Sequence, residues 1–160
     1  MEKVRVSKIL SELGLCSRRE ADQHIQNGHV LVDGQVVIEL GAKASRDQKI
    51  TLNKAGLQKQ TQKLTILLNK PVGYISHYDD EKKYKPALSL IDKENFYGEK
   101  NTFPTKFNLK GMAPAGRLDI DSTGLLILTQ DGVIAKEIIG EQSQIEKEYL
   151  VRVEGSLSDN

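Results

Sequence analysis

The spacing of apolar residues predicts two helices near the start of the chain. Apolar residues at helical spacing, followed by a glycine that ends the helix, mark the first one: Val4, Ile9, Leu10, Leu13 and Gly14. The second predicted helix opens at Ser17, and Glu20 three residues later completes a capping box. In that helix Ala21 and Ile25 fall on the inward face, and Gly28 ends it.

A hairpin and a further strand follow these helices. Residues 30–38 read as two β-rich runs around Asp33-Gly34, a pair typical of a tight hairpin turn. Residues 49–52 read as another strand, so residues 1–53 form a helix-helix-strand module. Residues 54–63 are polar and show no helical face, which predicts a linker.

The remaining residues, 64–160, predict a second module in which strands and a helix are mixed. Its expected elements are strands at 64–69, 125–128 and 148–153 and a helix at 133–139. Between them, residues 79–112 are polar and nearly without periodicity, apart from a short helix or strand at 87–91. The pattern predicts an α+β protein of two modules.

Composition and charge indicate a soluble protein with an uneven charge distribution. The chain is 38% hydrophobic and 28% charged, and no apolar run is long enough to cross a bilayer. Its N-terminus lacks the apolar core of a signal peptide, so we expect a cytoplasmic protein without a membrane partner. Residues 1–63 hold 11 Lys and Arg against 7 Asp and Glu, net +4, whereas residues 64–160 hold 12 against 15, net −3. The first module is therefore biased toward a polyanion.

The sequence offers no ligand set for a structural metal. Cys16 is the single cysteine and the chain has three histidines, which excludes a disulfide framework and a zinc site. Cys16 precedes the capping box and is expected to pack as a small apolar residue. No motif calls for a cofactor.

Residues 119–124, Asp-Ile-Asp-Ser-Thr-Gly, carry the densest candidate chemistry. A calcium loop fits poorly, because Gln130 stands where a bidentate glutamate belongs. An aspartyl-phosphate phosphatase also fits poorly, since no hydrophobic strand precedes Asp119. A third possibility is a loop that projects Asp119 beside Arg117, which would keep the carboxylate ionised as a nucleophile. An ordinary Arg–Asp pair on a turn remains an alternative.

Several motifs resemble those of one enzyme family. In the second module they are Asn69-Lys70-Pro71-x-Gly73, Gly116-Arg117-Leu118-Asp119, Asp121-Ser122-x-Gly124-Leu125-Leu126, Leu128-Thr129-x-Asp131-Gly132 and Glu146-Lys147-Glu148-Tyr149-Leu150-Val151. Together they resemble the RsuA/RluB/RluE/RluF-type pseudouridine synthases, which isomerise a uridine in ribosomal RNA. In the first module, Ser7-Lys8-x-Leu10, Cys16-Ser17-Arg18-Arg19-Glu20-Ala21 and Val32-Asp33-Gly34 are similar to the S4 RNA-binding domain that precedes the catalytic domain in that family.

The resemblance implies a role for individual residues. Asp119 would be the covalent nucleophile, Arg117 would brace the stack vacated by a flipped uridine, and Tyr149 would stack on the uracil. The residues expected to bind RNA are Arg5, Lys8, Arg18, Arg19, Lys70 and Lys147. Arg18 and Arg19 sit at the first turn of a helix, where free backbone N–H groups would also favour phosphate.

The resemblance also sets expectations about the whole protein. It implies a mixed or antiparallel catalytic sheet, incomplete here because the family's sheet continues past the strand that carries Tyr149. The expected partner is ribosomal RNA, and the complete form is expected to be a monomer. Gln130 departs from the family pattern, which commonly has Asn there. The rival hypothesis is a non-catalytic RNA-binding protein that keeps part of the fold.

Overall fold

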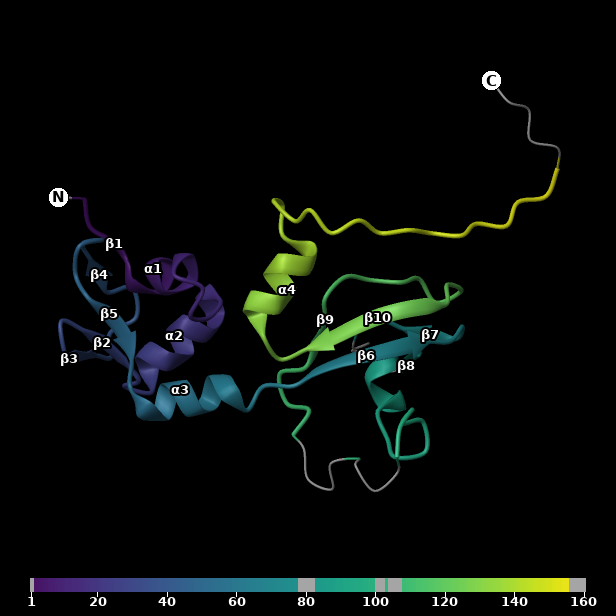
Figure 1. The fold of residues 1–160 in the computed structure, drawn as a ribbon, viewed down its shortest axis with the longest axis horizontal. Helices are drawn as coiled ribbons and strands as arrows, with labels where there is room; N and C mark the ends of the chain where they lie inside the picture. Colours follow the sequence, from purple (N-terminus) through teal and green to yellow (C-terminus); the bar gives the residue numbers. More distant parts are fainter. Residues whose placement is uncertain (1, 78–82, 100–102, 104–107, 156–160) are drawn as a thin grey trace.

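The computed structural model describes residues 2–77, 83–99, 103 and 108–155 of the 160-residue chain. Its helices and strands form two units that lie side by side, joined by a helix (Figure 1). We call residues 4–52 the first module, and the elements from residue 65 onward the second module. Both combine helices with sheets, so the predicted α+β class is confirmed.

The first module is built from two helices and short strands. Its elements are β1 (Val4–Arg5), α1 (Val6–Glu12), α2 (Arg18–Gln26), β2 (Val30–Val32), β3 (Gln35–Val37), β4 (Lys43–Ala44) and β5 (Ile50–Leu52). β2 is the centre of an antiparallel sheet between β3 and β5, and β1 pairs with β4. These elements match the helix-helix-strand pattern predicted from the sequence.

Local signals fix the turns of this module as predicted. The Ser17 backbone N–H donates to Glu20 Oε2 at 2.6 Å, and the Glu20 N–H donates to Ser17 Oγ at 3.4 Å, which completes the capping box of α2. Asp33 and Gly34 both have positive φ, 50° and 82°, in the turn between β2 and β3. That conformation matches the twist of the flanking strands, so the hairpin is confirmed.

One contiguous core holds the first module together. Helices and strands contribute buried apolar side chains to it: Val6, Ile9, Leu10, Cys16, Ala21, Ile25, Val30, Ala44, Ile50 and Leu52. Cys16 is fully buried, as expected, and burial raises the pKa of its thiol to about 11. The thiol is therefore unreactive and packs as an apolar group.

The segment predicted to be an unstructured linker is a helix. Residues Lys54–Thr61 form α3, and the side chain of Asn53 caps it by accepting from the Gly56 N–H at 3.0 Å. Gly56 is buried against Leu52 and His29, with room for little more than a hydrogen there. The prediction relied on amphipathic periodicity, but strong helix formers and an N-cap stabilise this helix without an apolar face.

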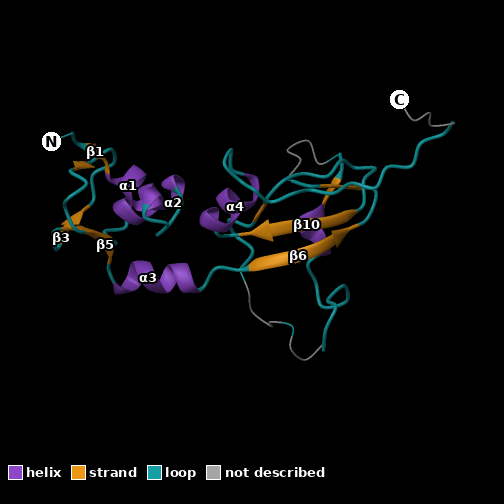
Figure 2. Ribbon diagram, turned by 45° about the horizontal axis from the view of Figure 1, so that its top comes forward, coloured by secondary structure: helices purple, strands orange, loops and turns teal. Residues whose placement is uncertain are grey.

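The second module has an antiparallel sheet at its centre. Its elements are β6 (Thr65–Lys70), β7 (Tyr74–Ile75), β8 (Lys85–Pro86), the 3₁₀ helix η1 (Ala87–Leu90), β9 (Ala113–Pro114), β10 (Gly124–Thr129) and α4 (Gly132–Ile139). β10 lies between β6 and β9 and is antiparallel to both, and β7 pairs with β8 in parallel (Figure 2). The strands predicted at 64–69 and 125–128, the helix at 133–139 and the short element at 87–91 are confirmed. Parts of the polar segment 79–112 lie outside the described residues.

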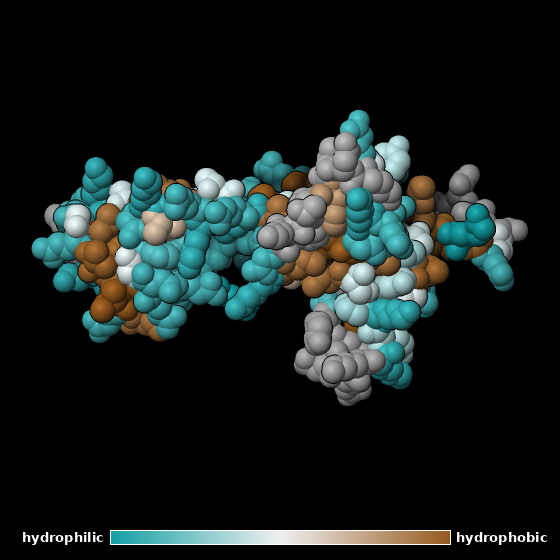
Figure 3. Space-filling model, turned by 90° about the horizontal axis from the view of Figure 1, so that it is seen from below, coloured by the Kyte–Doolittle hydropathy of each residue, from teal (hydrophilic) through white to brown (hydrophobic). Residues whose placement is uncertain are grey.

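The sheet buries one face and leaves apolar residues on the other. Leu126 and Leu128 of β10 are buried, and they pair with Leu68 and Ile66 of β6 and pack with Ala87 of η1. On the opposite face Leu67 and Leu125 are 70% and 65% exposed. The face of the second module drawn in Figure 3 also shows brown, apolar surface between hydrophilic side chains.

The strand predicted at 148–153 is absent. Residues 143–153 contain no helix or strand, and this yellow segment runs away from the sheet (Figure 1). Tyr149 is 62% exposed and Leu150 is 95% exposed. Alternating apolar residues favour a strand, but a strand forms only against a neighbouring backbone, and no described strand pairs with this segment. Among the described residues, no helix is both long and apolar enough to traverse a bilayer.

Candidate active site

Asp119 lies in the loop that connects two paired strands of the second module. The loop leaves the sheet at β9 and returns at β10, which places Asp119 just beyond the sheet's end. The Ser122 N–H donates to the Asp119 carbonyl oxygen at 3.0 Å, so a tight turn follows the aspartate. Its side chain is exposed and therefore accessible to a substrate.

Residues 73–76 clamp the backbone on both sides of Asp119. The buried Ser76 hydroxyl donates to the Leu118 carbonyl oxygen at 2.6 Å and accepts from the Leu118 N–H at 2.8 Å. On the other side, the Gly73 N–H donates to the Ile120 carbonyl oxygen at 2.8 Å. Gly73 has a φ of 85°, a conformation that favours glycine. The clamp holds an exposed carboxylate on a fixed backbone, as a positioned nucleophile requires.

Lys70, which the sequence predicts to bind RNA, holds the backbone next to this clamp. It is fully buried, and its ammonium donates to the carbonyl oxygens of Pro71 at 3.0 Å and Tyr74 at 2.8 Å. Burial lowers the pKa of the Lys70 ammonium, and the charges of Asp119 and Asp121 oppose that shift. The ammonium stabilises the loop backbone in this structure, and a contact between Lys70 and RNA stays a prediction.

The predicted ion pair between Arg117 and Asp119 does not form. Both side chains are exposed, and no ion pair of the described residues joins them. The prediction assumed an extended loop, whereas Gly116 has a φ of 105° and a turn begins at Asp119. An ion pair between two exposed side chains would add little to the stability of the fold, because both charged groups are as well solvated by water.

Arg117 and Asp119 nevertheless line the same cavity. The cavity measures about 730 Å³, and its other walls include Ile75, His77 and Tyr84. That volume lies within the range of about 300–1,000 Å³ typical of small-ligand sites. Sequence reasoning missed His77 and Tyr84, although His77 follows the Asn69–Gly73 motif closely.

The structure does not bring the predicted Tyr149 and Lys147 to this cavity. Neither is among its lining residues. Both lie in the extended segment after α4, where the Lys147 ammonium donates to the Ile138 carbonyl oxygen at 3.2 Å. Of the two tyrosines, it is Tyr84 that lines the cavity together with Asp119.

The predicted RNA-binding residues of the first module are mostly accessible. Arg5, Arg18 and Arg19 are exposed, and Lys8 forms an ion pair with Glu12 at 3.8 Å. The capping box of α2 uses the backbone N–H groups of Ser17 and Glu20, and phosphate binding by Arg18 and Arg19 at the first turn stays a prediction. Among the described residues, no group of three potential ligands could hold a metal ion.

Comparison with known proteins matches both modules to described families. Residues 4–50 match the S4 domain, and residues 64–160 match the RNA pseudouridylate synthase family. An "Uncharacterized RNA pseudouridine synthase" of Aquifex aeolicus (strain VF5) is 33% identical over 156 residues, which are 98% of this chain and 60% of that protein. The "Ribosomal large subunit pseudouridine synthase B" of Bacillus subtilis (strain 168) is 34% identical, over 94% of this chain and 56% of that protein.

A third relative extends the comparison. The "Dual-specificity RNA pseudouridine synthase RluF" of Escherichia coli O6:H1 is 33% identical, over 98% of this chain and 49% of that protein. The chain thus spans 49–60% of the length of these three relatives. The family match covers most of the chain and all of the candidate site, and it confirms the resemblance seen in the motifs. The chain belongs to the RNA pseudouridylate synthase family and carries an S4 domain before its synthase domain.

Proposed function

We propose that this protein converts uridine to pseudouridine in ribosomal RNA, with Asp119 as the covalent nucleophile. The observation that carries the proposal is the family match over residues 64–160, which contain an accessible aspartate on a clamped backbone at the rim of a cavity. The names of the Bacillus subtilis and Escherichia coli relatives support RNA as the substrate, and the former supports ribosomal RNA.

A carboxylate alone can supply the chemistry of this isomerisation. The N1–C1′ bond of uridine breaks, the uracil turns, and a C5–C1′ bond forms. C5 loses a proton and N1 gains one, so atoms and charge balance. The Asp119 carboxylate forms a transient covalent bond either to C1′ or to the pyrimidine ring and leaves unchanged. Both routes need the carboxylate to be accessible to the substrate, as Asp119 is.

The other residues of the cavity fit the handling of an extruded nucleotide. A uridine inside folded RNA must leave its stack before Asp119 can reach it. Arg117 is exposed in the same cavity as the nucleophile and can fill the vacated position. Tyr84 also lines this cavity, with the Lys83 ammonium 5.3 Å from the centroid of its ring. Lys70 and Ser76 hold the loop and need not contact the RNA.

The test compares two aspartates of the same loop. Asp119→Asn keeps the shape of the side chain but removes the nucleophile, so we expect turnover to fall at least about a thousandfold with RNA affinity unchanged. Asp121→Asn is the matched control. Asp121 is exposed like Asp119, and the charges of both aspartates act to raise the pKa of Lys70. Its turnover should stay within about tenfold of the unaltered protein.

Tritium release from ribosomal RNA labelled at uracil C5 measures the turnover directly, because C5 loses its hydrogen in the reaction. Residual activity of Asp119→Asn within tenfold of the unaltered protein contradicts the assignment of the nucleophile. RNA binding without turnover by the unaltered protein contradicts the proposed function and favours a non-catalytic RNA-binding protein.

A further inference from the structure

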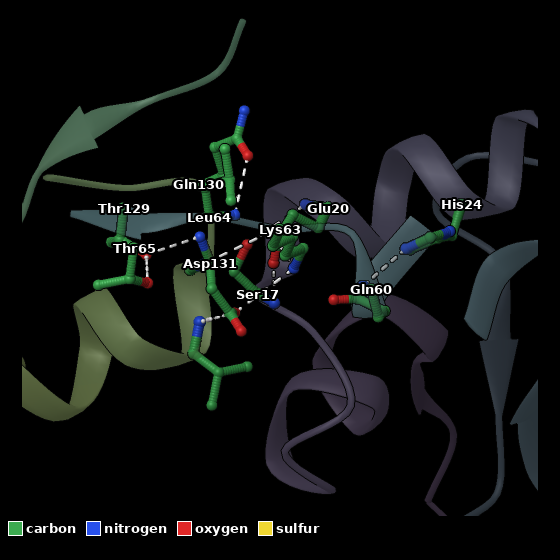
Figure 4. A network of polar contacts seen from close by, with 12 residues as sticks. Ser17, Glu20, His24, Gln60, Lys63, Leu64, Thr65, Thr129, Gln130 and Asp131 are labelled. Carbon is green, nitrogen blue, oxygen red and sulfur yellow. Dashed lines mark hydrogen bonds and ion pairs between the residues drawn. The ribbon is translucent and has the colours of Figure 1, made fainter. Parts of the chain in front are cut away.

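The two modules meet at an ion-pair network centred on Lys63. The Lys63 ammonium lies 2.5 Å from Glu20 Oε1 of α2 and 3.4 Å from Asp131 Oδ1 at the start of α4 (Figure 4). Its side chain is only 14% exposed, and that of Glu20 18%. Burial acts to raise the pKa of Glu20, but hydrogen bonds from Lys63 and Ser17 outweigh it and the pKa is lowered. The network is therefore mostly shielded from solvent, where salt screens ion pairs less.

The backbone of α4 also contacts side chains of the first module at this point. The Gly132 N–H donates to Glu20 Oε1 at 3.4 Å, so one carboxylate serves both helix starts. A Cβ added at Gly132 would lie 2.4 Å from Ser17 Cβ, closer than two such atoms can approach. Next to it, Gln130 Oε1 accepts from the Leu64 N–H at 3.0 Å. We call Ser17, Glu20, Lys63, Asp131 and Gly132 the junction.

A cleft of about 880 Å³ opens beside the junction, and both modules line it. Exposed amide and lysine side chains make up much of its wall: Gln23, Asn27, Lys59, Gln62, Asn108 and Lys110. Gln23 and Asn27 come from α2, and Lys59 from α3. Asn108 and Lys110 come from the second module, where Gln130 Nε2 donates to the carbonyl oxygens of Asn108 at 2.6 Å and Lys110 at 2.9 Å.

The charge left in the cleft is positive. Glu20 is the one carboxylate among its lining residues, and Lys63 neutralises it. Burial lowers the pKa of His24, another lining residue, so it is neutral at pH 7. Lys59 and Lys110 remain, and neither ammonium forms an ion pair with a described residue. A cleft with two free ammonium groups and several amides offers phosphate contacts and hydrogen bonds to ribose or base edges.

We propose that this cleft is an RNA-binding site, formed by both modules together and held in shape by the junction. A single-stranded segment fits its size and chemistry, because unpaired bases offer their Watson–Crick edges to amide side chains. Phosphates would contact Lys59 and Lys110, while Lys63 acts on the protein and not on the RNA. The proposal rests on the proposed function for its ligand class, but its test measures binding and is independent of turnover.

The first experiment removes the two free lysines. Lys59→Gln combined with Lys110→Gln should weaken binding of a single-stranded ribosomal RNA fragment about tenfold. The slope of log affinity against log salt should fall by about 1.4, since each single-strand contact contributes about 0.7. The control double variant is Lys54→Gln with Lys136→Gln, which removes the same charge from exposed positions of α3 and α4 outside the cleft. An equal slope in both double variants overturns the proposal.

A second experiment changes the shape of the cleft without changing its charge. Gly132→Ala forces the modules apart at Ser17 but replaces none of the lysines. We expect RNA affinity to fall at least about fivefold while each module keeps its own core, as checked by amide hydrogen exchange of the buried residues. Unchanged affinity in a folded Gly132→Ala protein overturns the role of the junction. If the unaltered protein binds RNA at this cleft but shows no turnover, that result contradicts the proposed function and leaves the RNA-binding cleft supported.

Discussion

The two modules bury their apolar residues to different degrees. In the first module a continuous buried cluster draws on α1, α2 and the strands β2, β4 and β5, and its members are 6% exposed or less. In the second module the buried cluster consists of Ala87, Leu126 and Leu128, with partly buried neighbours around it. The outer face of β6 and β10 keeps Leu67 and Leu125 in solvent. The first module therefore depends on packing, and the second depends more on hydrogen bonds between segments.

The sites reflect this difference. Polar groups of the second module tie distant segments together: Ser76 to Leu118, and Thr65 Oγ1 to Thr129 Oγ1 at 2.8 Å. Buried hydrogen bonds of this kind stabilise one geometry, because leaving either partner unsatisfied costs about 1–3 kcal/mol. An accessible cavity next to Asp119 is compatible with such a frame, whereas a closed apolar core leaves no room for a ligand.

The largest effect should come from the packed core. Leu10→Ala removes a side chain that is fully buried in the first module, so we expect the free energy of unfolding to fall by about 3 kcal/mol. Leu13→Ala is the matched control, because Leu13 follows the same helix and is 57% exposed. Its effect should stay below about 0.5 kcal/mol. Urea unfolding followed by amide hydrogen exchange measures both, and similar losses for the two variants would show that the first module is not organised around this core.

The polar clamp of the second module should give a smaller effect, but at the site. Ser76→Ala removes both hydrogen bonds to Leu118, which costs about 1–3 kcal/mol locally. We expect kcat to fall about tenfold with little change in KM, because Asp119 loses its position and not its contact with RNA. Exchange of the Leu118 amide should also accelerate.

Two variants sharpen the interpretation of the clamp. Ser76→Thr restores the hydroxyl and should recover most of the turnover. Ser122→Ala, in the same loop beyond Asp119, should leave kcat and the Leu118 amide unchanged. A Ser76→Ala protein with normal kcat and normal exchange at Leu118 would mean that the clamp does not position the aspartate.

The sequence predicts more of the first module than of the second, because the interactions that shape the first module are more local. The capping box at Ser17 and the Asp33-Gly34 turn act between neighbours in sequence, so their local pattern was sufficient. The strands at 64–69 and 125–128 were found from their apolar runs, but their pairing joins distant segments and was not specified. Helix α3 was missed because its stability comes from propensity and capping and not from an apolar face.

Within the candidate site, residue types were more predictable than their contacts. Motif resemblance singled out Asp119 and Arg117, and both line the cavity. The ion pair between them was predicted from their spacing in an extended loop, which the turn after Asp119 prevents. The motif resemblance names Lys70 as an RNA-binding residue, whereas in the structure backbone carbonyl oxygens hold its ammonium in the interior. Contacts of this kind depend on the tertiary path of a loop, which a single sequence does not reveal.

The smallest expected effect concerns a buried histidine at the base of the first module. His24 Nδ1 lies 3.1 Å from His29 Nδ1, and Gln60 Nε2 of α3 donates to His24 Nε2 at 2.8 Å (Figure 4). Burial lowers the pKa of His24 from its ordinary 6.5, and the nearby charges of Lys63 and Lys59 act in the same direction. The neutral ring is thus the form that the fold accepts, because protonation of Nε2 would end its bond from Gln60.

The sign of the resulting pH dependence follows from that lowered pKa. Above pH 6.5 His24 is neutral in the folded and unfolded chains, and its contribution to stability is complete. As the pH falls below 6.5, the unfolded chain binds a proton first, so the free energy of unfolding decreases until the folded protein also protonates. A single titrating group changes the free energy of unfolding by at most about 1.4 kcal/mol per pH unit.

Urea unfolding at pH 7.5 and 5.5 should show this decrease in the unaltered protein and in His77→Leu, in which an exposed histidine is replaced. His24→Leu should flatten it, and a pH dependence equal in all three proteins would exclude His24 as its source.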